Sequence, residues 1–267
     1  MFSIWKSPFG FLDLYEVSIK IGVVVSLIIQ GILIVKVKKR IRYLLFLLCY
    51  VGILYAGSYV AAFVRCSNDG ALDGKMNLWD AVLNMRGTHF LGYVITFALL
   101  FFPMAWFLRD LIVEAADYTL CSNVEILQIG ELMAIGLPIQ HIFNRIGCLC
   151  RGCCYGIQYD GIFAITLPYN TELKDTVFPC QILEILGMII ILVIVIMRYR
   201  KGQHVFGTIL IGFSITFFIA EFFTANPYAV KHGGLTYVQI YSFVLLLMGI
   251  LYRIVWDKLA KVGNKNE

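Results

Sequence analysis

Long apolar runs separated by short clusters of charged residues make up most of this 267-residue chain. A helix needs roughly 20 apolar residues to cross a bilayer, and several runs approach that length. The pattern predicts an all-α, polytopic integral membrane protein with about seven transmembrane helices, forming a single transmembrane domain over residues 1–267. The expected spans are residues 17–35, 43–64, 89–108, 126–143, 182–197, 206–223 and 237–256.

Composition and charge refine this interpretation. The chain is 60% hydrophobic and 15% charged, whereas a soluble domain carries about 25% charged residues. Basic residues concentrate in the short segments after the first and fifth runs and at the C-terminal end, whereas the segment after the third run contributes only Arg109 and is otherwise acidic. The positive-inside rule then places the N-terminus outside, the C-terminus in the cytoplasm and a motif-bearing loop near 144–178 on the outer side. The net charge of +5 reflects this topology, and we expect no nucleic-acid partner.

The segment from Asn144 to Gly156, NRIGCLCRGCCYG, gathers arginine, cysteine and glycine at the end of the fourth run. An arginine near membrane depth is costly unless it meets a partner or an anionic ligand. The planar guanidinium fork matches phosphate bidentately, so Arg145 and Arg151 are candidate catalytic residues acting on an anionic headgroup. In the alternative interpretation both side chains only snorkel to lipid phosphates.

Four thiols cluster in the same segment, at Cys148, Cys150, Cys153 and Cys154. Cys150 and Cys153 form a CxxC pair, a spacing typical of redox centres with a lowered thiol pKa. The cluster is also compatible with a zinc site, although a zinc finger needs two such pairs. A disulfide, or packing of small side chains, is the third interpretation. We expect no cofactor.

Three further polar residues lie in or beside apolar runs. His89 opens the third run and is a candidate general base, because histidine accepts protons near neutral pH. A lone interfacial histidine more often makes only a structural hydrogen bond. Glu184 and Glu221 lie within apolar runs, where carboxylates are either paired or functional. The arginines of the motif and Lys231 are their candidate partners.

On these residues the chain resembles the bacterial prolipoprotein diacylglyceryl transferases, because four short blocks follow one another in the family's order. The family's Gly-Arg-x-Gly-Asn-Phe block is matched by NRIGCL at 144–149, His-Pro-Ser-Gln-Leu-x-Glu by FPCQILE at 178–184, Glu-Phe-Phe by EFF at 221–223, and Gly-Leu-x-x-x-Gln by GLTYVQ at 234–239. The likeness covers roughly Thr88 to the C-terminal end.

The resemblance implies transfer of a diacylglyceryl group from phosphatidylglycerol to a cysteine thiol of a prolipoprotein or related acceptor. Arg145 would hold the lipid phosphate, and His89 would match the family's histidine at the start of the third helix. The implied substrate-binding residues are Gly147, Gln181, Glu184, Glu221 and Gln239. The implied partners are a phospholipid and a cysteine-bearing protein or peptide, at the outer leaflet of the bacterial cell (inner) membrane.

The chain departs from the family pattern at several polar positions. Cys148 stands for an asparagine, Arg151 and Cys153 for a second asparagine and a glutamate, Phe178 for a histidine, and Phe217 for an arginine of the sixth helix. We hypothesise that Arg151 replaces that missing arginine.

Two other functions remain open at this point. One is a membrane thiol–disulfide oxidoreductase that uses Cys150 and Cys153. The other is a non-catalytic, lipid-binding relative of the transferases.

Overall fold

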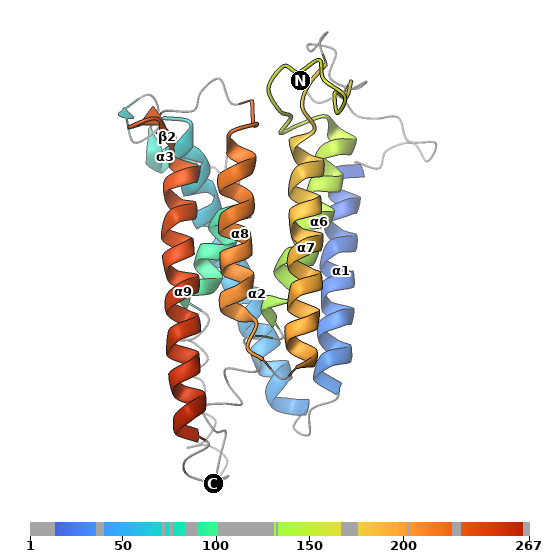
Figure 1. Cartoon of the computed structure of the whole chain (residues 1–267), viewed down its shortest axis with the longest axis vertical. Coiled ribbons are helices and arrows are strands. Elements are labelled where there is room, and N and C mark those ends of the chain that lie inside the picture. Colours follow the sequence, from blue (N-terminus) through green and yellow to red (C-terminus); the bar gives the residue numbers. More distant parts are fainter. Residues whose placement is uncertain are drawn as a thin grey trace.

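The structure is a computed structural model that describes residues 14–35, 40–70, 73–74, 77–83, 90–100, 131, 133–166, 176–201, 203–225 and 231–263. Within these ranges the chain forms a bundle of long helices (Figure 1). A two-stranded antiparallel hairpin precedes the last helix. The labelled elements are α1 (Leu14–Val35), α2 (Arg40–Asn68), α3 (Leu78–Leu83), α6 (Gly136–Arg151), α7 (Cys180–Arg200), α8 (Phe206–Glu221), β1 (Lys231–His232), β2 (Leu235–Thr236) and α9 (Tyr237–Gly263).

Three of the described helices are long and apolar enough to cross a bilayer: Leu14–Leu33, Cys180–Arg200 and Tyr237–Val255. Phe90–Leu100 and Phe206–Glu221 are shorter apolar helices. Large aliphatic side chains such as Ile190 and Leu251 are exposed, as expected of a surface that contacts lipid. The all-α class is confirmed. The seven spans and their orientation remain predictions, and residues 101–130 lie outside the described part of the chain.

Helices α1 and α6 pack closely and run antiparallel. A Cβ at Gly22 would lie 2.6 Å from Cβ of Phe143, and a Cβ at Gly136 would overlap the side chain of Gln30. Gln30 also donates a hydrogen bond of 2.8 Å to the carbonyl of Met133. Small residues allow backbones to approach where lipid offers no hydrophobic driving force between helices. The contact fixes α6, which carries the motif arginine.

The centre of the bundle is filled by buried aromatic residues, including Phe97, Phe213 and Phe217. Helices α8 and α9 meet at another glycine contact, where a Cβ at Gly207 would lie 2.7 Å from the carbonyl oxygen of Gly249. This packing holds α8 against the helices that carry the polar residues described below.

The motif segment differs from the expected loop. Helix α6 continues to Arg151, so residues 144–151 form its last two turns. The helix ends at Gly152, whose φ of 68° is left-handed, and the Cys153 N–H donates to the carbonyl of Cys148 over 3.1 Å. This is the glycine-capped ending that terminates many helices. The expectation that a loop begins at Asn144 is therefore wrong by two turns, because the apolar run does not mark where the helix ends.

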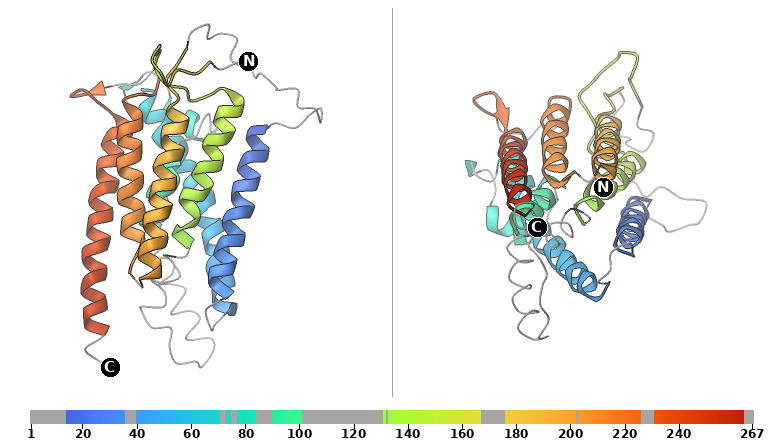
Figure 2. Two further views of the ribbon diagram at one scale, coloured as in Figure 1. Left: turned by 45° about the vertical axis from the view of Figure 1, so that its right-hand side comes forward. Right: turned by 60° about the horizontal axis from the view of Figure 1, so that its bottom comes forward.

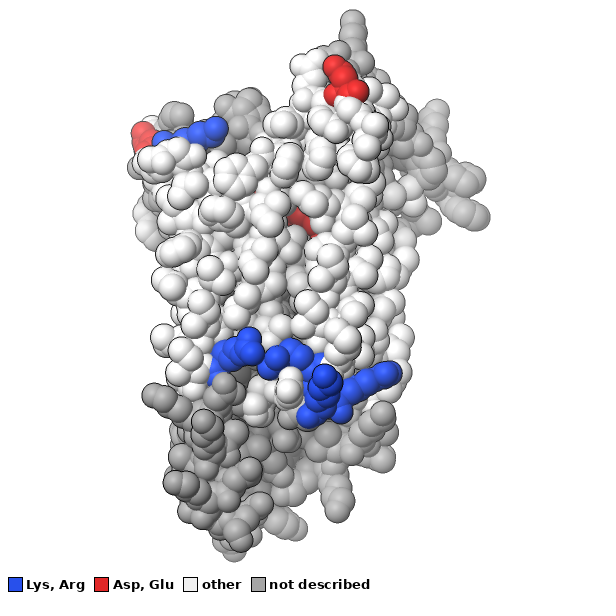
Figure 3. All heavy atoms as spheres, viewed as in Figure 1, with Lys and Arg blue, Asp and Glu red and all other residues white. Residues whose placement is uncertain are grey.

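The two ends of the bundle differ in charge. At one end, here called the site end, α6 and α8 finish and α7 begins (Figures 1 and 2). At the opposite end α7 finishes with Arg198, Arg200 and Lys201, and α9 contributes Arg253. Figure 3 shows a band of basic side chains crossing this opposite end, below a broad face that carries almost no charged side chains.

Candidate active site

A buried polar group joins α6 and α7 near the site end. Arg145 donates from Nε to Oε2 of Glu184 over 2.8 Å, and Nε2 of His141 lies 2.8 Å from the same oxygen. Arg145 is 9% exposed, Glu184 3% and His141 0%. The three side chains thus form one connected network in a largely apolar interior. Burying such charges is tolerated only when they are paired and hydrogen-bonded.

Within the described part of the chain, some hydrogen-bond donors of Arg145 have no partner. Guanidinium carries five N–H groups. Among the described residues, Nε binds Glu184 and Nη1 makes a long contact of 3.9 Å with Sγ of Cys148. Glu184 therefore fixes the orientation of the side chain while donors on its far edge remain for an anion. A planar fork held in this way is suited to two phosphate oxygens.

Sequence analysis missed His141 as a site residue. Its ring is enclosed by Phe90, Phe213 and Phe217, with centroid separations of 4.6, 5.8 and 5.1 Å. Because a carboxylate only accepts hydrogen bonds, Nε2 of His141 carries a proton and donates this hydrogen bond to Glu184. The signal in the sequence was the spacing from His141 to Arg145, which places both on one face of a helix.

Three of the four clustered thiols come together just beyond the end of α6. The sulfur atoms of Cys148, Cys153 and Cys154 all lie within 4.8 Å of one another. Cys148 is buried, Cys153 is half-buried and Cys154 is exposed. Cys150 does not belong to this group. The predicted CxxC pair is therefore not the arrangement that the fold brings together.

The backbone of this turn is held from α7. Gln181 donates from Nε2 to the carbonyl of Cys153 over 2.9 Å, and the Cys180 thiol donates to the carbonyl of Cys154 over 2.9 Å. Cys154 has a φ of 55°, a left-handed conformation that non-glycine residues rarely adopt. Gln181 thus supports the thiol group through the backbone, a role that the sequence did not indicate.

The thiol group also has an electrostatic environment of its own. The pKa of the Cys154 thiol is well below its usual range, because the thiols of Cys148 and Cys153 hydrogen-bond to it. The positive charges of Arg145 and Arg65 lower the pKa of Cys154 further. Arg65, near the end of α2, is a second cation that sequence analysis did not associate with the site, because a long stretch of chain separates it from the motif.

Arg151 lies beside the thiol group, on the last turn of α6. Its Cζ atom is 4.2 Å from the ring centroid of Tyr15 in α1, a cation–π contact. Gly147 faces the same tyrosine, and a Cβ there would lie 2.9 Å from the ring. Tyr15 therefore packs against both motif residues.

Glu221 and Gln239 lie at the ends of the C-terminal helices. Asn68 of α2 donates to Glu221 over 3.4 Å. Oε1 of Gln239 accepts from the backbone N–H of Thr236 over 3.0 Å, and the Gln239 N–H donates to Oγ1 of Thr236 over 3.3 Å. This reciprocal pair is a capping box that starts α9. Substrate binding by both residues stays a prediction, as it does for Gly147. His89 lies outside the described residues.

Gly156 lies where three segments meet: the end of the motif, the start of α7 and the end of α8. Its N–H donates to the carbonyl of Phe178 over 3.0 Å, and the N–H of Ile157 donates to the carbonyl of Phe223 over 2.8 Å. A Cβ at Gly156 would overlap the first carbonyl oxygen and lie 2.8 Å from the second. Only glycine fits this crossing, which ties the end of the motif to the start of α7 and the end of α8.

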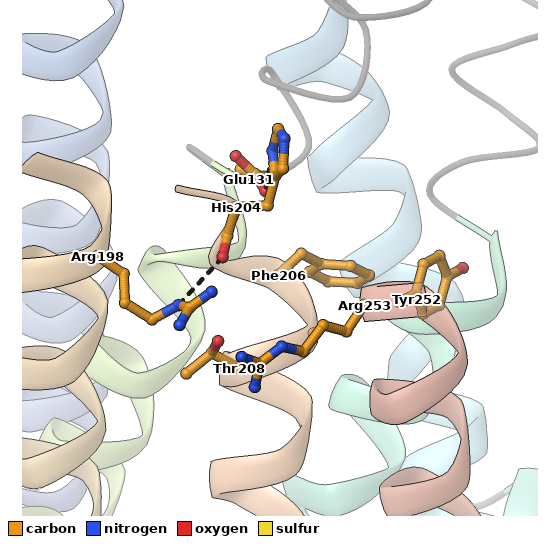
Figure 4. A pocket seen from close by; sticks show the side chains of 8 residues that line it. Glu131, Arg198, His204, Phe206, Thr208, Tyr252 and Arg253 are labelled. Atoms are coloured by element: carbon orange, nitrogen blue, oxygen red, sulfur yellow. Dashed lines mark hydrogen bonds and ion pairs between the residues drawn. The ribbon is translucent and has the colours of Figure 1, made fainter. Parts of the chain in front are cut away.

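A polar pocket lies at the opposite end, lined by Glu131, Arg198, His204 and Arg253 among others (Figure 4). Oε1 of Glu131 accepts from the Val205 N–H over 2.9 Å and lies 3.2 Å from Nδ1 of His204. Val205 is the N-cap residue of α8. Glu131 thus satisfies the start of a helix, where a negative charge is favourable.

The chain matches a protein family and a curated protein. The family described as prolipoprotein diacylglyceryl transferase matches residues 8–255. The chain is also 29% identical over 145 residues to the phosphatidylglycerol–prolipoprotein diacylglyceryl transferase 2 of Clostridium perfringens (strain 13 / Type A). The alignment covers 51% of this chain and 56% of the clostridial protein, so the chain spans about half the length of the curated relative that it matches.

Proposed function

We propose that this chain, which belongs to the prolipoprotein diacylglyceryl transferase family, transfers the diacylglyceryl group of phosphatidylglycerol to the cysteine thiol of a prolipoprotein or related acceptor. The name of the clostridial relative supports both substrates. The observation that carries the proposal is the buried pair of Arg145 and Glu184, because both residues fall in blocks that resemble the family's motifs. A buried arginine with unused donors is suited to a phosphate that gains charge as a bond to it breaks.

The reaction assigns one task to each polar group. Arg145 binds the phosphate and stabilises the departing glycerol phosphate. Arg151, on the same helix, adds a second positive charge. His89 accepts the proton of the acceptor thiol, which a histidine does readily near neutral pH. Gly147, Gln181, Glu184, Glu221 and Gln239 shape the headgroup pocket, either directly or by holding the elements around it.

The membrane orientation follows from charge. The basic band of Arg198, Arg200, Lys201 and Arg253 lies at the end opposite to Arg145. The positive-inside rule assigns that band to the cytoplasmic side. The site end then faces the outer leaflet of the bacterial cell (inner) membrane, with the N-terminus outside, the C-terminus in the cytoplasm and seven spans in total.

No contact among the described residues supports the thiol–disulfide alternative. It needs Cys150 and Cys153 as a pair, and the thiol group contains Cys153 without Cys150. A non-catalytic relative would bind the lipid without forming product, so an assay of product formation distinguishes it from a transferase.

The test is a reconstituted transfer assay. The purified full-length protein is mixed with phosphatidylglycerol vesicles and a peptide that carries one cysteine in a lipobox sequence. We expect mass spectrometry to detect a diacylglyceryl adduct on the peptide. Replacing Arg145 by Ala should lower the rate about 10²–10³-fold, the usual effect of losing one charge-stabilising donor group. Vesicles of phosphatidylethanolamine, and a peptide with serine in place of cysteine, are the controls. Retained lipid with no adduct would contradict the proposal and favour a non-catalytic relative.

A further inference from the structure

The thiol group has the composition and shape of a metal site. Its three sulfur atoms lie within 4.8 Å of one another, whereas the sulfurs around a tetrahedral zinc ion lie about 3.8 Å apart, given Zn–S bonds of about 2.3 Å. A contraction of about 1 Å would therefore be enough to place all three on one ion. Cys153 and Cys154 sit in the turn beyond Gly152, where rotation of their side chains can bring the sulfur atoms closer while the hydrogen bond from the Cys153 N–H to the Cys148 carbonyl is kept.

We propose that Cys148, Cys153 and Cys154 bind one Zn²⁺ ion as thiolates, and that the fourth coordination position receives the sulfur of the acceptor cysteine. The second half rests on the proposed function. The first half stands on the geometry alone and revises the expectation that the protein needs no cofactor.

Zinc suits this ligand set better than other metals. Thiolate ligands select soft or borderline ions, and zinc accepts them in tetrahedral geometry without redox chemistry. Structural zinc sites are closed by four protein ligands, whereas catalytic sites keep three ligands and an open position. The described residues offer three thiols within reach of one another, so the site has the catalytic pattern.

The surroundings are those of a built site. The carbonyls of Cys153 and Cys154 are held by Gln181 and Cys180, each over 2.9 Å. These two hydrogen bonds hold the backbone of the turn that carries both thiols. The left-handed backbone of Cys154 is explained by the same site, because this conformation places the third thiol beside the other two.

The negative charge of a zinc–thiolate site would be compensated by Arg145. Three thiolates and Zn²⁺ carry a net charge of −1. Nη1 of Arg145 lies 3.9 Å from Sγ of Cys148, so a guanidinium stands next to the negative ligands. The exposed position of Cys154 and the buried position of Cys148 place the ion at the boundary between the bundle and its surface, where a peptide thiol has access.

The chemistry follows from these positions. Coordination to zinc deprotonates a thiol at neutral pH, and the proton passes to the base that the proposed function assigns to His89. The bound sulfur attacks the glyceryl carbon of the lipid, forming a C–S bond. The C–O bond to phosphate breaks, and its electron pair leaves with glycerol phosphate beside Arg145. Nothing is oxidised or reduced, and the zinc ion is retained.

The metal half is tested without any measurement of activity. The full-length protein is purified in detergent under reducing conditions, loaded with Zn²⁺, and analysed for bound metal by mass spectrometry. We expect about one ion per chain. Replacing Cys153 or Cys154 by Ser should weaken binding at least about 10-fold, since losing even an outer-shell partner costs about 10–100-fold. Cys150→Ser is the matched control and should bind as the wild type does. Circular dichroism checks the fold of each variant.

Two results would overturn the metal site. One is reduced wild-type protein that binds no Zn²⁺. The other is a Cys150→Ser variant that loses the metal as completely as Cys153→Ser, because zinc would then be held by a different set of thiols.

The acceptor half is tested with Co²⁺ in place of zinc. Adding the lipobox peptide should strengthen the sulfur-to-cobalt charge-transfer absorption, while the peptide with serine should not. An unchanged spectrum overturns this half. If metal and thiol bind but no adduct forms, the site stands and the proposed function fails. If adduct formation survives complete removal of metal, the proposed function stands and the acceptor half of the zinc proposal fails.

Discussion

Arg145 of α6 and Glu184 of α7 form a buried ion pair, with Nε and Oε2 separated by 2.8 Å. The pair joins two helices and orients the guanidinium, while His141 binds the same carboxylate oxygen. If Arg145 binds the lipid phosphate as proposed, stability and lipid recognition depend on one contact, and substitutions can separate the two effects.

Replacing Glu184 by Gln should destabilise the protein and lower its activity. The change leaves the Arg145 charge buried without its counter-charge, and breaking such a pair costs about 3–5 kcal/mol. We expect a clear drop in the thermal unfolding temperature in detergent. Glu16→Gln is the control, because Glu16 pairs with Lys20 at the exposed surface of α1 and such pairs contribute little. Equal unfolding temperatures for the two variants would contradict the buried pair.

Replacing His141 by Phe should preserve the fold and reduce transfer. The ring lies among Phe90, Phe213 and Phe217, so a phenyl group fits the space. The hydrogen bond to Glu184 is lost, and bonds to charged groups contribute about 1.5–3 kcal/mol. If that energy positions Arg145, kcat/KM should fall about 10–100-fold. Unchanged kcat/KM in a folded variant would show that His141 is only a packing residue.

The sequence predicted where several helices lie and which buried polar residues matter, but not how those residues contact one another. Apolar runs located α1, α7 and α9 well, since each run satisfies the length that a bilayer requires. The cost of burying charge in apolar runs identified Arg145 and Glu184 as candidates. The sequence did not show that they pair with each other, because that depends on how α6 packs against α7.

The thiols show where sequence spacing misleads. A CxxC pattern suggested Cys150 and Cys153. Helix α6 continues to Arg151, so Cys148 and Cys150 are about 200° apart around its axis, given about 100° per residue. Only Cys148 faces the turn that returns with Cys153 and Cys154. The helix end, set by Gly152, decides which thiols meet.

Replacing Arg151 by Ala tests whether it substitutes for the arginine that the family carries on its sixth helix. Arg151 stacks on Tyr15 at 4.2 Å and lies one turn and a half beyond Arg145. We expect transfer to fall at least about 10-fold, since charge-stabilising groups commonly contribute 10²-fold or more. Arg200→Ala, at the opposite end of the bundle, should leave the rate unchanged. Full activity in Arg151→Ala would refute the substitution.

Replacing Gly156 by Ala should destabilise the site end. A methyl group would overlap the carbonyl of Phe178, forcing apart the start of α7 and the end of the motif; overpacking of this kind costs about 1–3 kcal/mol. Gly31→Ala is the matched control, because a Cβ there meets no atom within 4 Å. Unfolding temperatures measured in detergent compare the two. A Gly156→Ala protein as stable as Gly31→Ala would contradict the crossing of the three segments.

The central claim is that a thiol displaces glycerol phosphate at carbon. The most direct measurement is a transfer reaction run in ¹⁸O-labelled water, with both products weighed by mass spectrometry. The account predicts equal amounts of peptide thioether and glycerol phosphate, with no ¹⁸O in either, and no release without the peptide. Glycerol phosphate released without the peptide, or ¹⁸O in a product, would show hydrolysis of the lipid and contradict the transferase.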